Sequence, residues 1–199
     1  MDVSAGTLDV LVWESEARGP DADPDRTVLA LHGFPESAWE WGSVAEVLVG
    51  QGVRVVAPMQ RGYSSGARPD DVRSYAIEHL SADALAVVDS LRLDRVHVLG
   101  HDWGASVAWW VAAHHPDRVA SLTAVSIPHL AAFSDAIYTD PDQQARSAYF
   151  GLFRQEGKAE DVLLEDDARR LRGMFAGQVP SDLVDRHLEV LGELSLIHI

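Results

Sequence analysis

Residues 96–115 decide the fold of this chain, and they are VHVLGHDWGASVAWWVAAHH. Val96–Leu99 is a short apolar run typical of a buried strand, and Ala105–His114 is a longer run typical of a helix. The turn between them carries a glycine at each end, Gly100 and Gly104. A buried strand that passes through a tight turn directly into a helix predicts one unit of a parallel α/β sheet.

The same alternation of strands and helices extends over the chain before Pro128. Runs rich in Val, Leu and Ala are typical of strands that are buried on both faces. The sequence therefore predicts an α/β fold, with a mostly parallel sheet and helices on both faces. The predicted strands are Leu8–Trp13, Thr27–Leu31, Val53–Ala57, Val96–Leu99 and Leu122–Ile127, the predicted helices are Ser43–Gly50, Tyr75–Leu91 and Ala105–His114, and Gly19–Asp25 is a predicted turn.

The chain changes character after Pro128. From Ser134 to Leu194 the apolar residues recur three and four positions apart, which is helical spacing, and no convincing strand is found. Pro180, Ser181 and Asp182 together form a plausible helix start. An all-helical segment is therefore expected after the α/β part.

Composition excludes several classes of protein. The chain has 199 residues, with 31 acidic and 16 basic side chains, a formal charge of −15 and no cysteine. An acidic protein repels phosphates, which argues against a nucleic-acid or anionic-membrane partner, and the lack of cysteine excludes disulfides. The longest apolar run, Val107–Ala113, is too short to span a bilayer, and the N-terminus shows no signal-peptide pattern. We predict a cytoplasmic protein of unspecified oligomeric state.

The residues between Gly100 and Gly104 place an aspartate where a nucleophile elbow, G-x-Nuc-x-G, carries its nucleophile. A carboxylate at the N-terminus of a helix stays ionised, and it can attack carbon directly to form an ester. The alternative is that Asp102 only caps its helix, which is a common role for aspartate. The motif taken alone leaves the two interpretations about equally favoured.

A second motif follows the predicted strand Thr27–Leu31: His32-Gly33-Phe34-Pro35. A loop at this point can supply one amide of an oxyanion hole, and the residue after the nucleophile supplies the other. The predicted donors are the backbone N–H groups of Phe34 and Trp103. A simple Gly-Pro turn is the alternative, but two motifs in the right order favour the catalytic interpretation.

On these motifs the sequence resembles the α/β-hydrolase family, and within it the epoxide-hydrolase branch. The resemblance rests on HGFPESAWEW at 32–41, APMQRGYSSGARP at 57–69 and GHDWGASVAWWVAAHHPDRVASLTAVSIPH at 100–129. It implies a small apolar organic substrate such as an epoxide, no metal or organic cofactor, and an alkyl-enzyme ester on Asp102 that water hydrolyses. It also implies a lid tyrosine that activates the epoxide oxygen. Tyr149 is the candidate, unless the family position corresponds to Leu152 or Phe153.

The resemblance also implies the organisation of the chain: an N-terminal part of the hydrolase core at 1–127 and a partial helical lid at 128–193. Residues 194–199 break the helical pattern that precedes them and are expected to be a non-native tail. A short native tail is the alternative for the last segment. The catalytic histidine and acid of the family, and the C-terminal strands of its sheet, are expected beyond the end of this sequence. We therefore expect a C-terminally truncated chain that is inactive as given.

Two other functions compete with an epoxide hydrolase. Haloalkane dehalogenases share the HDWG motif, but they usually place Asn after HG, where this chain has Phe34. A non-catalytic binder with the same fold would use the pocket under the lid. Such a binder has no need of an aspartate in an intact elbow, so Asp102 favours the enzyme.

Overall fold

The computed structural model describes residues 1–15, 26–155, 157–175 and 177–192, and the chain divides into two compact units, 1–127 and 128–199. The predicted turn Gly19–Asp25 and the predicted tail 194–199 lie outside the described residues. Among the described helices, none combines the length and the hydropathy needed to cross a bilayer.

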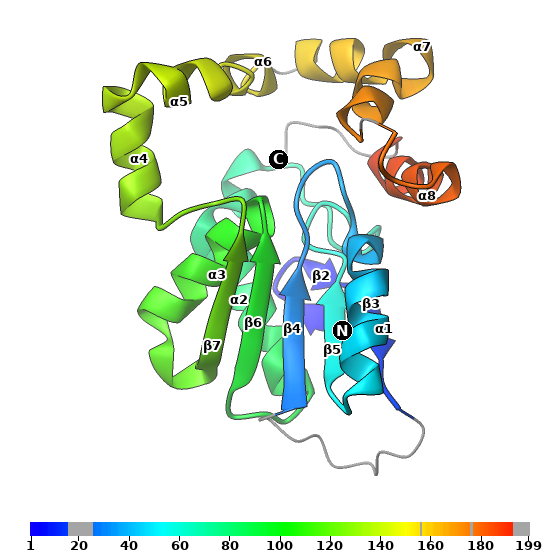
Figure 1. Cartoon of the computed structure of the whole chain (residues 1–199), viewed down its shortest axis with the longest axis vertical. Helices are drawn as coiled ribbons and strands as arrows, with labels where there is room; N and C mark the ends of the chain where they lie inside the picture. The colour runs from blue at the N-terminus through cyan, green and yellow to red at the C-terminus, as the bar shows by residue number, and fades with distance from the viewer. Residues whose placement is uncertain (16–25, 156, 176, 193–199) are drawn as a thin grey trace. The chain divides into compact units, whose positions relative to one another are not determined.

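The first unit is built around one sheet. The strands are β1 (Asp2–Val3), β2 (Gly6–Thr7), β3 (Val10–Trp13), β4 (Thr27–Leu31), β5 (Arg54–Pro58), β6 (Val96–His101) and β7 (Val119–Val125), and the helices are α1 (Gly42–Gly50), α2 (Ile77–Ser90) and α3 (Trp103–His114). β1 and β2 form a small hairpin. The other strands form a sheet in the order β3-β5-β4-β6-β7, in which β3 is antiparallel to β5 and the remaining pairs are parallel (Figure 1). The predicted mostly parallel sheet is confirmed.

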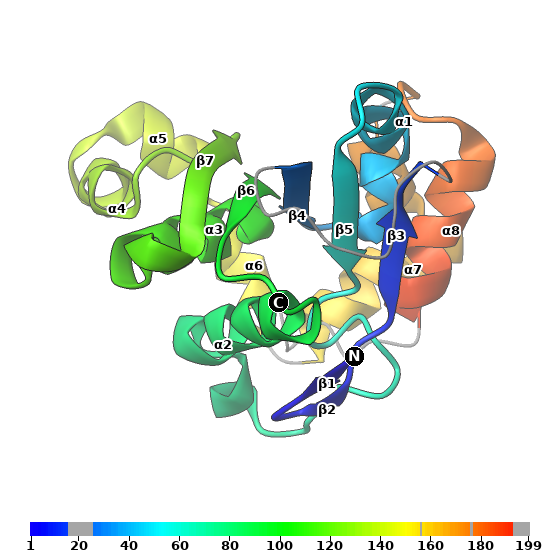
Figure 2. The ribbon, with the colours of Figure 1, turned by 90° about the horizontal axis from the view of Figure 1, so that it is seen from below.

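The helices cover both faces of this sheet, as predicted. Figure 2 shows α1 on one face, and α2 and α3 on the other. The chain moves outward from β4 to β5 through α1, and then returns past β4 to β6 through α2. Right-handed crossovers in opposite directions place their helices on opposite faces. The strand order therefore reverses between β4 and β6, which is where α/β sheets place their ligand sites.

Burial explains why the central strands were recognisable. All of β4, from Thr27 to Leu31, is buried, and so are Val55, Val56 and Ala57 of β5. The predicted strand at Leu122–Ile127 is displaced, because β7 pairs with β6 from Val119 onward and Ser126 has a φ of 71°, which ends the extended backbone. The apolar alternation alone did not reveal this start.

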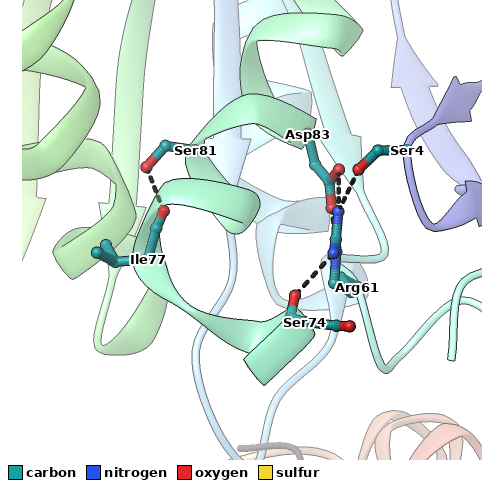
Figure 3. Close-up of polar contacts among 6 residues, drawn as sticks. All are labelled: Ser4, Arg61, Ser74, Ile77, Ser81 and Asp83. Atoms are coloured by element: carbon teal, nitrogen blue, oxygen red, sulfur yellow. Dashed lines mark hydrogen bonds and ion pairs between the residues drawn. The ribbon is translucent and has the colours of Figure 1, made fainter. Parts of the chain in front are cut away.

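A buried ion pair ties three segments of the first unit together (Figure 3). Arg61 is 5% exposed, and it donates two hydrogen bonds to Asp83 of α2, at 2.8 and 2.7 Å. It also donates to the Ser74 carbonyl at 2.7 Å and to Oγ of Ser4 at 2.9 Å. One guanidinium thus joins the β1–β2 hairpin, the turn before α2 and α2 itself.

The second unit is entirely helical over its described residues, as expected. Its helices are α4 (Leu130–Thr139), α5 (Pro141–Arg146), α6 (Phe150–Phe153), α7 (Lys158–Met174) and α8 (Ser181–Gly192). α8 begins at Ser181, where the Pro-Ser-Asp sequence predicted a start. α7 is interrupted at Glu165–Ala168, where the backbone is not helical. Leu163, Leu171, Leu188 and Leu191 are buried in this unit.

Candidate active site

Asp102 lies in a tight turn between β6 and α3. Its φ of 49° and ψ of −119° are unfavourable for a residue with a side chain, and such strain persists only where the surroundings fix it. Its N–H donates to the Val125 carbonyl at 3.2 Å, and its own carbonyl accepts from Ala105 at 2.9 Å and from Ser106 at 3.1 Å. Asp102 therefore occupies a nucleophile elbow held from both sides.

The elbow depends on close backbone approaches that only glycine permits. A Cβ on Gly104 would lie 2.1 Å from the Leu31 carbonyl oxygen of β4, and a Cβ on Gly33 would lie 2.5 Å from Cβ of Asp102. Real Cβ atoms essentially never lie this close to another atom. Gly104 lets α3 pack against the end of β4, and Gly33 lets the loop after β4 pass directly beside the aspartate.

That loop brings the amide of Phe34 to the Asp102 side chain. The Phe34 N–H donates to Oδ1 of Asp102 at 3.1 Å, although 68 positions separate the two residues. Asp102 occupies the N-cap position of α3, but its side chain makes no capping hydrogen bond. The helix-cap interpretation is therefore wrong for the carboxylate, which is bound across the turn instead.

Trp103 follows Asp102 as the first residue of α3, and its side chain is 44% exposed. The first four N–H groups of a helix have no acceptor within the helix. The Trp103 amide is therefore available at the helix N-terminus beside Asp102. The structure thus brings together three of the predicted site residues, Asp102, Phe34 and Trp103, at the point where the strand order reverses.

His32 supports the loop that carries Phe34. The ring is fully buried, and the Gln60 backbone N–H donates to its Nε2 at 3.2 Å. Because Nε2 accepts, the ring proton lies on Nδ1, which donates to the Gly33 carbonyl at 3.0 Å. The Gln60 side chain also donates to the His32 carbonyl at 2.6 Å. His32 is therefore a structural residue of the loop.

Two glutamates and a histidine gather beside the elbow: Glu36, Glu40 and His101. Nδ1 of His101 lies 3.1 Å from Oε2 of Glu40. One ligand atom from each of the three side chains lies within 4.8 Å of the other two, so the set could hold a metal ion. The Glu40–His101 hydrogen bond already uses one atom of each partner. Sequence reasoning missed the two glutamates, although their spacing of four residues in the loop after β4 was visible.

Burial shifts the titration of this cluster. It raises the pKa of Glu40 to about 7, against the smaller lowering effect of His101. Burial also raises the pKa of Glu36. The hydrogen bond from Glu40 raises the pKa of His101 above its ordinary value. Tyr63 is also buried, and burial, followed by the charge of Asp102, raises its pKa well above the usual range. Each of these four groups is therefore shifted toward its protonated form.

Tyr149, the remaining predicted site residue, lies in the second unit, immediately before α6. Its ring contacts those of Phe150 and Phe153 edge-on, with centroids 4.7 and 5.2 Å apart, and its side chain is 47% exposed. The structure therefore places Tyr149 in an aromatic cluster with Phe153, one of the two alternative positions considered for the lid tyrosine.

A parallel sheet that reverses at β4 and β6, with an aspartate elbow at that point, is the architecture of an α/β hydrolase. The sequence profile of the alpha/beta hydrolase fold family matches residues 26–178, and the chain belongs to this family. The predicted fold class is confirmed.

Individual members of the family are similar to this chain. The chain is 37% identical over 159 residues to epoxide hydrolase A of Mycobacterium tuberculosis, covering 77% of this chain and 48% of the relative. It is 35% identical over 140 residues to the AB hydrolase superfamily protein YfhM of Bacillus subtilis, covering 70% and 49%. The chain therefore spans about half the length of these curated relatives.

A solved structure is also similar to this chain. An epoxide hydrolase of Bacillus megaterium, crystallised with an inhibitor, superposes with a TM-score of 0.86 at 25% identity. The match covers all of this chain and 69% of that one. Epoxide hydrolases are thus among the proteins to which this chain is similar in both sequence and structure.

Proposed function

We propose that this chain carries the nucleophile and the oxyanion hole of an epoxide hydrolase. The observation that carries the proposal is the hydrogen bond from the Phe34 amide to Oδ1 of Asp102. A helix cap would have turned the carboxylate toward α3. Instead, an amide from the loop after β4 binds one of its oxygens, which is the arrangement needed when that oxygen becomes an oxyanion.

The two carboxylate oxygens then have different roles. Oδ2 attacks an epoxide carbon, the ring C–O bond breaks, and the alkoxide so formed takes a proton from a hydroxyl group. Oδ1 becomes the carbonyl oxygen of the ester. When water adds to that ester, it loses one proton, which restores the hydroxyl group that protonated the alkoxide. Negative charge then develops on Oδ1, where the amides of Phe34 and Trp103 stabilise it. Collapse of this intermediate releases the diol and restores the carboxylate.

The helical unit 128–192 would act as a lid, and the hydroxyl of Tyr149 would protonate the alkoxide. The substrate would be a small apolar organic epoxide. The oxyanion hole and the carboxylate need no metal or organic cofactor for these steps. A cytoplasmic location fits the absence of cysteine and the charge of −15.

Trapping the ester tests the proposal. The purified chain is incubated with excess phenyl-substituted epoxide, and the modified residue is mapped by mass spectrometry. We expect one added epoxide, on Asp102, that persists because no group of this chain is assigned as the base for ester hydrolysis; a positioned base accelerates such a step by about 10²–10⁴. The Asp102→Asn variant should remain unmodified.

Asp94→Asn is the matched control, because Asp94 is an exposed aspartate of the same unit, and this variant should be modified like the unaltered chain. Adduct on another residue, or equal adduct in Asp102→Asn, would refute the assignment. Epoxide binding without any adduct would support a non-catalytic binder instead. A bromoalkane of similar size that reacts faster than the epoxide would favour dehalogenase chemistry.

A further inference from the structure

The loop that carries the Phe34 amide, residues 32–34, is held by a glutamine from another segment of the chain. Gln60 lies two residues after β5, and its backbone N–H donates to Nε2 of His32 at 3.2 Å. Its side-chain amide donates to the His32 carbonyl at 2.6 Å. Gln60 therefore binds both the ring and the backbone of His32, although 28 positions separate the two residues.

The His32 ring connects this contact to the Phe34 amide. Because Nε2 accepts from Gln60, the ring proton lies on Nδ1, which donates to the Gly33 carbonyl at 3.0 Å. The Gly33 carbonyl and the Phe34 N–H belong to one planar peptide group. A hydrogen bond at one end of this group therefore limits rotation at the other end. It keeps the Phe34 N–H directed at Oδ1 of Asp102, 3.1 Å away.

The same hydrogen bond strengthens the Phe34 amide as a donor. A peptide group whose carbonyl accepts a hydrogen bond is polarised, and its N–H then donates more strongly. Hydrogen bonds are also stronger away from water, and both His32 and Gly33 are buried. The Phe34 amide is thus oriented and polarised before negative charge develops on Oδ1, as electrostatic preorganisation requires.

The turn after β5 holds Gln60 itself in place. The Gln60 carbonyl accepts hydrogen bonds from the backbone N–H groups of Tyr63 at 2.9 Å and Ser64 at 3.2 Å. The Tyr63 ring packs edge-on against the His32 ring, with centroids 4.4 Å apart. This turn therefore fixes the backbone of Gln60 and also contacts the ring that Gln60 binds.

We propose that Gln60 is a positioning residue of the oxyanion hole, which acts through His32 to orient the Phe34 amide toward Asp102. The inference rests on the proposed function in taking that amide as an oxyanion donor. The Gln60 side chain fixes the peptide group before Gly33, and the Gln60 backbone N–H fixes the His32 tautomer that holds the next peptide group. Gln60 needs no contact with the substrate for this role.

Amide NMR of the 199-residue chain, labelled with nitrogen-15 at phenylalanine, tests the proposal without any epoxide. Gln60→Met keeps the length of the side chain but removes its donor. We expect the Phe34 amide proton to move upfield and to exchange about two- to tenfold faster, which corresponds to the loss of one ordinary hydrogen bond. Gln60→Glu should have the same effect, because a carboxylate cannot donate.

Gln51→Met is the matched control, since Gln51 is an exposed glutamine of the same unit, and the Phe34 amide should not change in this variant. An unchanged Phe34 amide in folded Gln60→Met would overturn the proposal. So would a change in Gln60→Glu alone, because the introduced charge would then account for it.

The His32 tautomer provides a measurement that does not depend on whether any variant folds. Nitrogen-15 spectra of the imidazole rings in the unaltered chain should show His32 protonated on Nδ1 and unprotonated on Nε2. The opposite tautomer would break the connection from Gln60 to the Gly33 carbonyl, and the proposal would be wrong.

The ester on Asp102 provides a spectroscopic signature that a loss of stability alone would not change. Hydrogen bonds to an ester carbonyl lower its stretching frequency, so weaker binding of Oδ1 by the Phe34 amide should raise it. In the trapped adduct of Gln60→Met we expect a higher infrared frequency than in the adduct of the unaltered chain. Equal frequencies would show that Gln60 does not act on the oxyanion hole.

The amide measurement also separates this proposal from the proposed function. If trapping fails while the Phe34 amide depends on Gln60, the positioning role stands and the epoxide chemistry does not. If Asp102 is alkylated but the Phe34 amide does not respond to Gln60, the chemistry stands and the positioning role is wrong.

Discussion

At the scale of single residues, the site depends on two glycines, because the lack of a Cβ allows close backbone contacts. Asp102 can hold its strained conformation only because neighbouring backbone comes very close, and Gly104 and Gly33 make that approach possible. The strain and the close approach belong together, since a relaxed elbow would move the carboxylate away from the Phe34 amide.

Gly104→Ala tests this dependence. The added methyl group would meet the Leu31 carbonyl oxygen at 2.1 Å, so the end of β4 or the start of α3 must move. Forced overpacking of this kind costs about 1–3 kcal/mol of unfolding free energy. We expect a loss in that range in urea unfolding, together with loss of the Asp102 adduct.

Gly42→Ala is its control. Gly42 begins α1 with a helical φ of −51°, and a Cβ there would meet nothing within 4 Å. Alanine favours a helix over glycine by up to about 1 kcal/mol, so this variant should be as stable as the unaltered chain or slightly more stable. Equal losses in both variants would show that the close approach at Gly104 is not required.

At the scale of secondary structure elements, the Arg61–Asp83 pair joins the β1–β2 hairpin to α2 and to the turn before it. The β1 and β2 strands are each two residues long, and a short isolated hairpin is barely stable in water. Arg61 attaches this hairpin, through Ser4, to the helix that carries Asp83 (Figure 3). The buried pair therefore fixes the arrangement of these elements.

Asp83→Asn should be strongly destabilising, because it leaves the buried Arg61 charge without its carboxylate. Breaking a buried ion pair from one side costs about 3–5 kcal/mol. Chemical denaturation monitored by circular dichroism would measure the loss, and amide exchange should show the β1–β2 hairpin opening first.

Asp89→Asn provides the comparison on the same helix. Asp89 pairs with Arg118, but its side chain is 65% exposed, and exposed pairs contribute about 0–1 kcal/mol. A loss in Asp83→Asn no larger than in Asp89→Asn would mean that burial gives the Arg61 pair no special role.

At the scale of the whole molecule, the two units contain titratable groups that respond to pH in opposite directions. In the first unit, Glu40 has its pKa raised to about 7, so its contribution to folding is present at low pH and is lost as the pH rises from 4.5 to about 7. In the second unit, burial lowers the pKa of His187 to about 4. Its ring is buried and stacks on Phe175.

The His187 contribution has the opposite sign. Between pH 6.5 and about 4 the unfolded chain binds a proton that the folded ring does not, so acidification favours unfolding. We expect the second unit to lose roughly 2 kcal/mol of stability between pH 7 and pH 4.5, since each unit of pKa shift corresponds to about 1.4 kcal/mol. Hydrogen exchange of α8 at pH 7 and pH 4.5 would measure the change.

His187→Phe should reduce this pH dependence while keeping the aromatic packing against Phe175. His79→Gln is the control, since His79 is an exposed histidine on α2, and it should leave the exchange of α8 unaffected. If α8 in His187→Phe still opens on acidification as it does in the unaltered chain, another group must account for the effect.

Much of this protein was determined by local sequence. Thr27–Leu31 is the predicted strand residue for residue, because a fully buried strand needs a continuous apolar run. The elbow at Asp102 was visible because its glycines follow a strand and precede a helix. The helical second unit followed from the spacing of its apolar side chains. Each of these features depends on residues that are close together in the chain, so a local pattern in the sequence can predict it.

Only the tertiary structure decided which distant groups meet. The Phe34 amide and Asp102 are 68 positions apart, and Glu40 and His101 are 61 apart. They lie together because β4 and β6 are neighbours in the sheet although β5 separates them in the chain. Local periodicity contains no information on strand order, so the pairing of Glu40 with His101 could not be derived from it. The Phe34 amide was expected at this site only because two motifs occur in the right order, and not from any local pattern. The sequence predicted the aspartate elbow, whereas the raised pKa values of Glu36, Glu40 and His101 arise from the packing of the sheet and its loops.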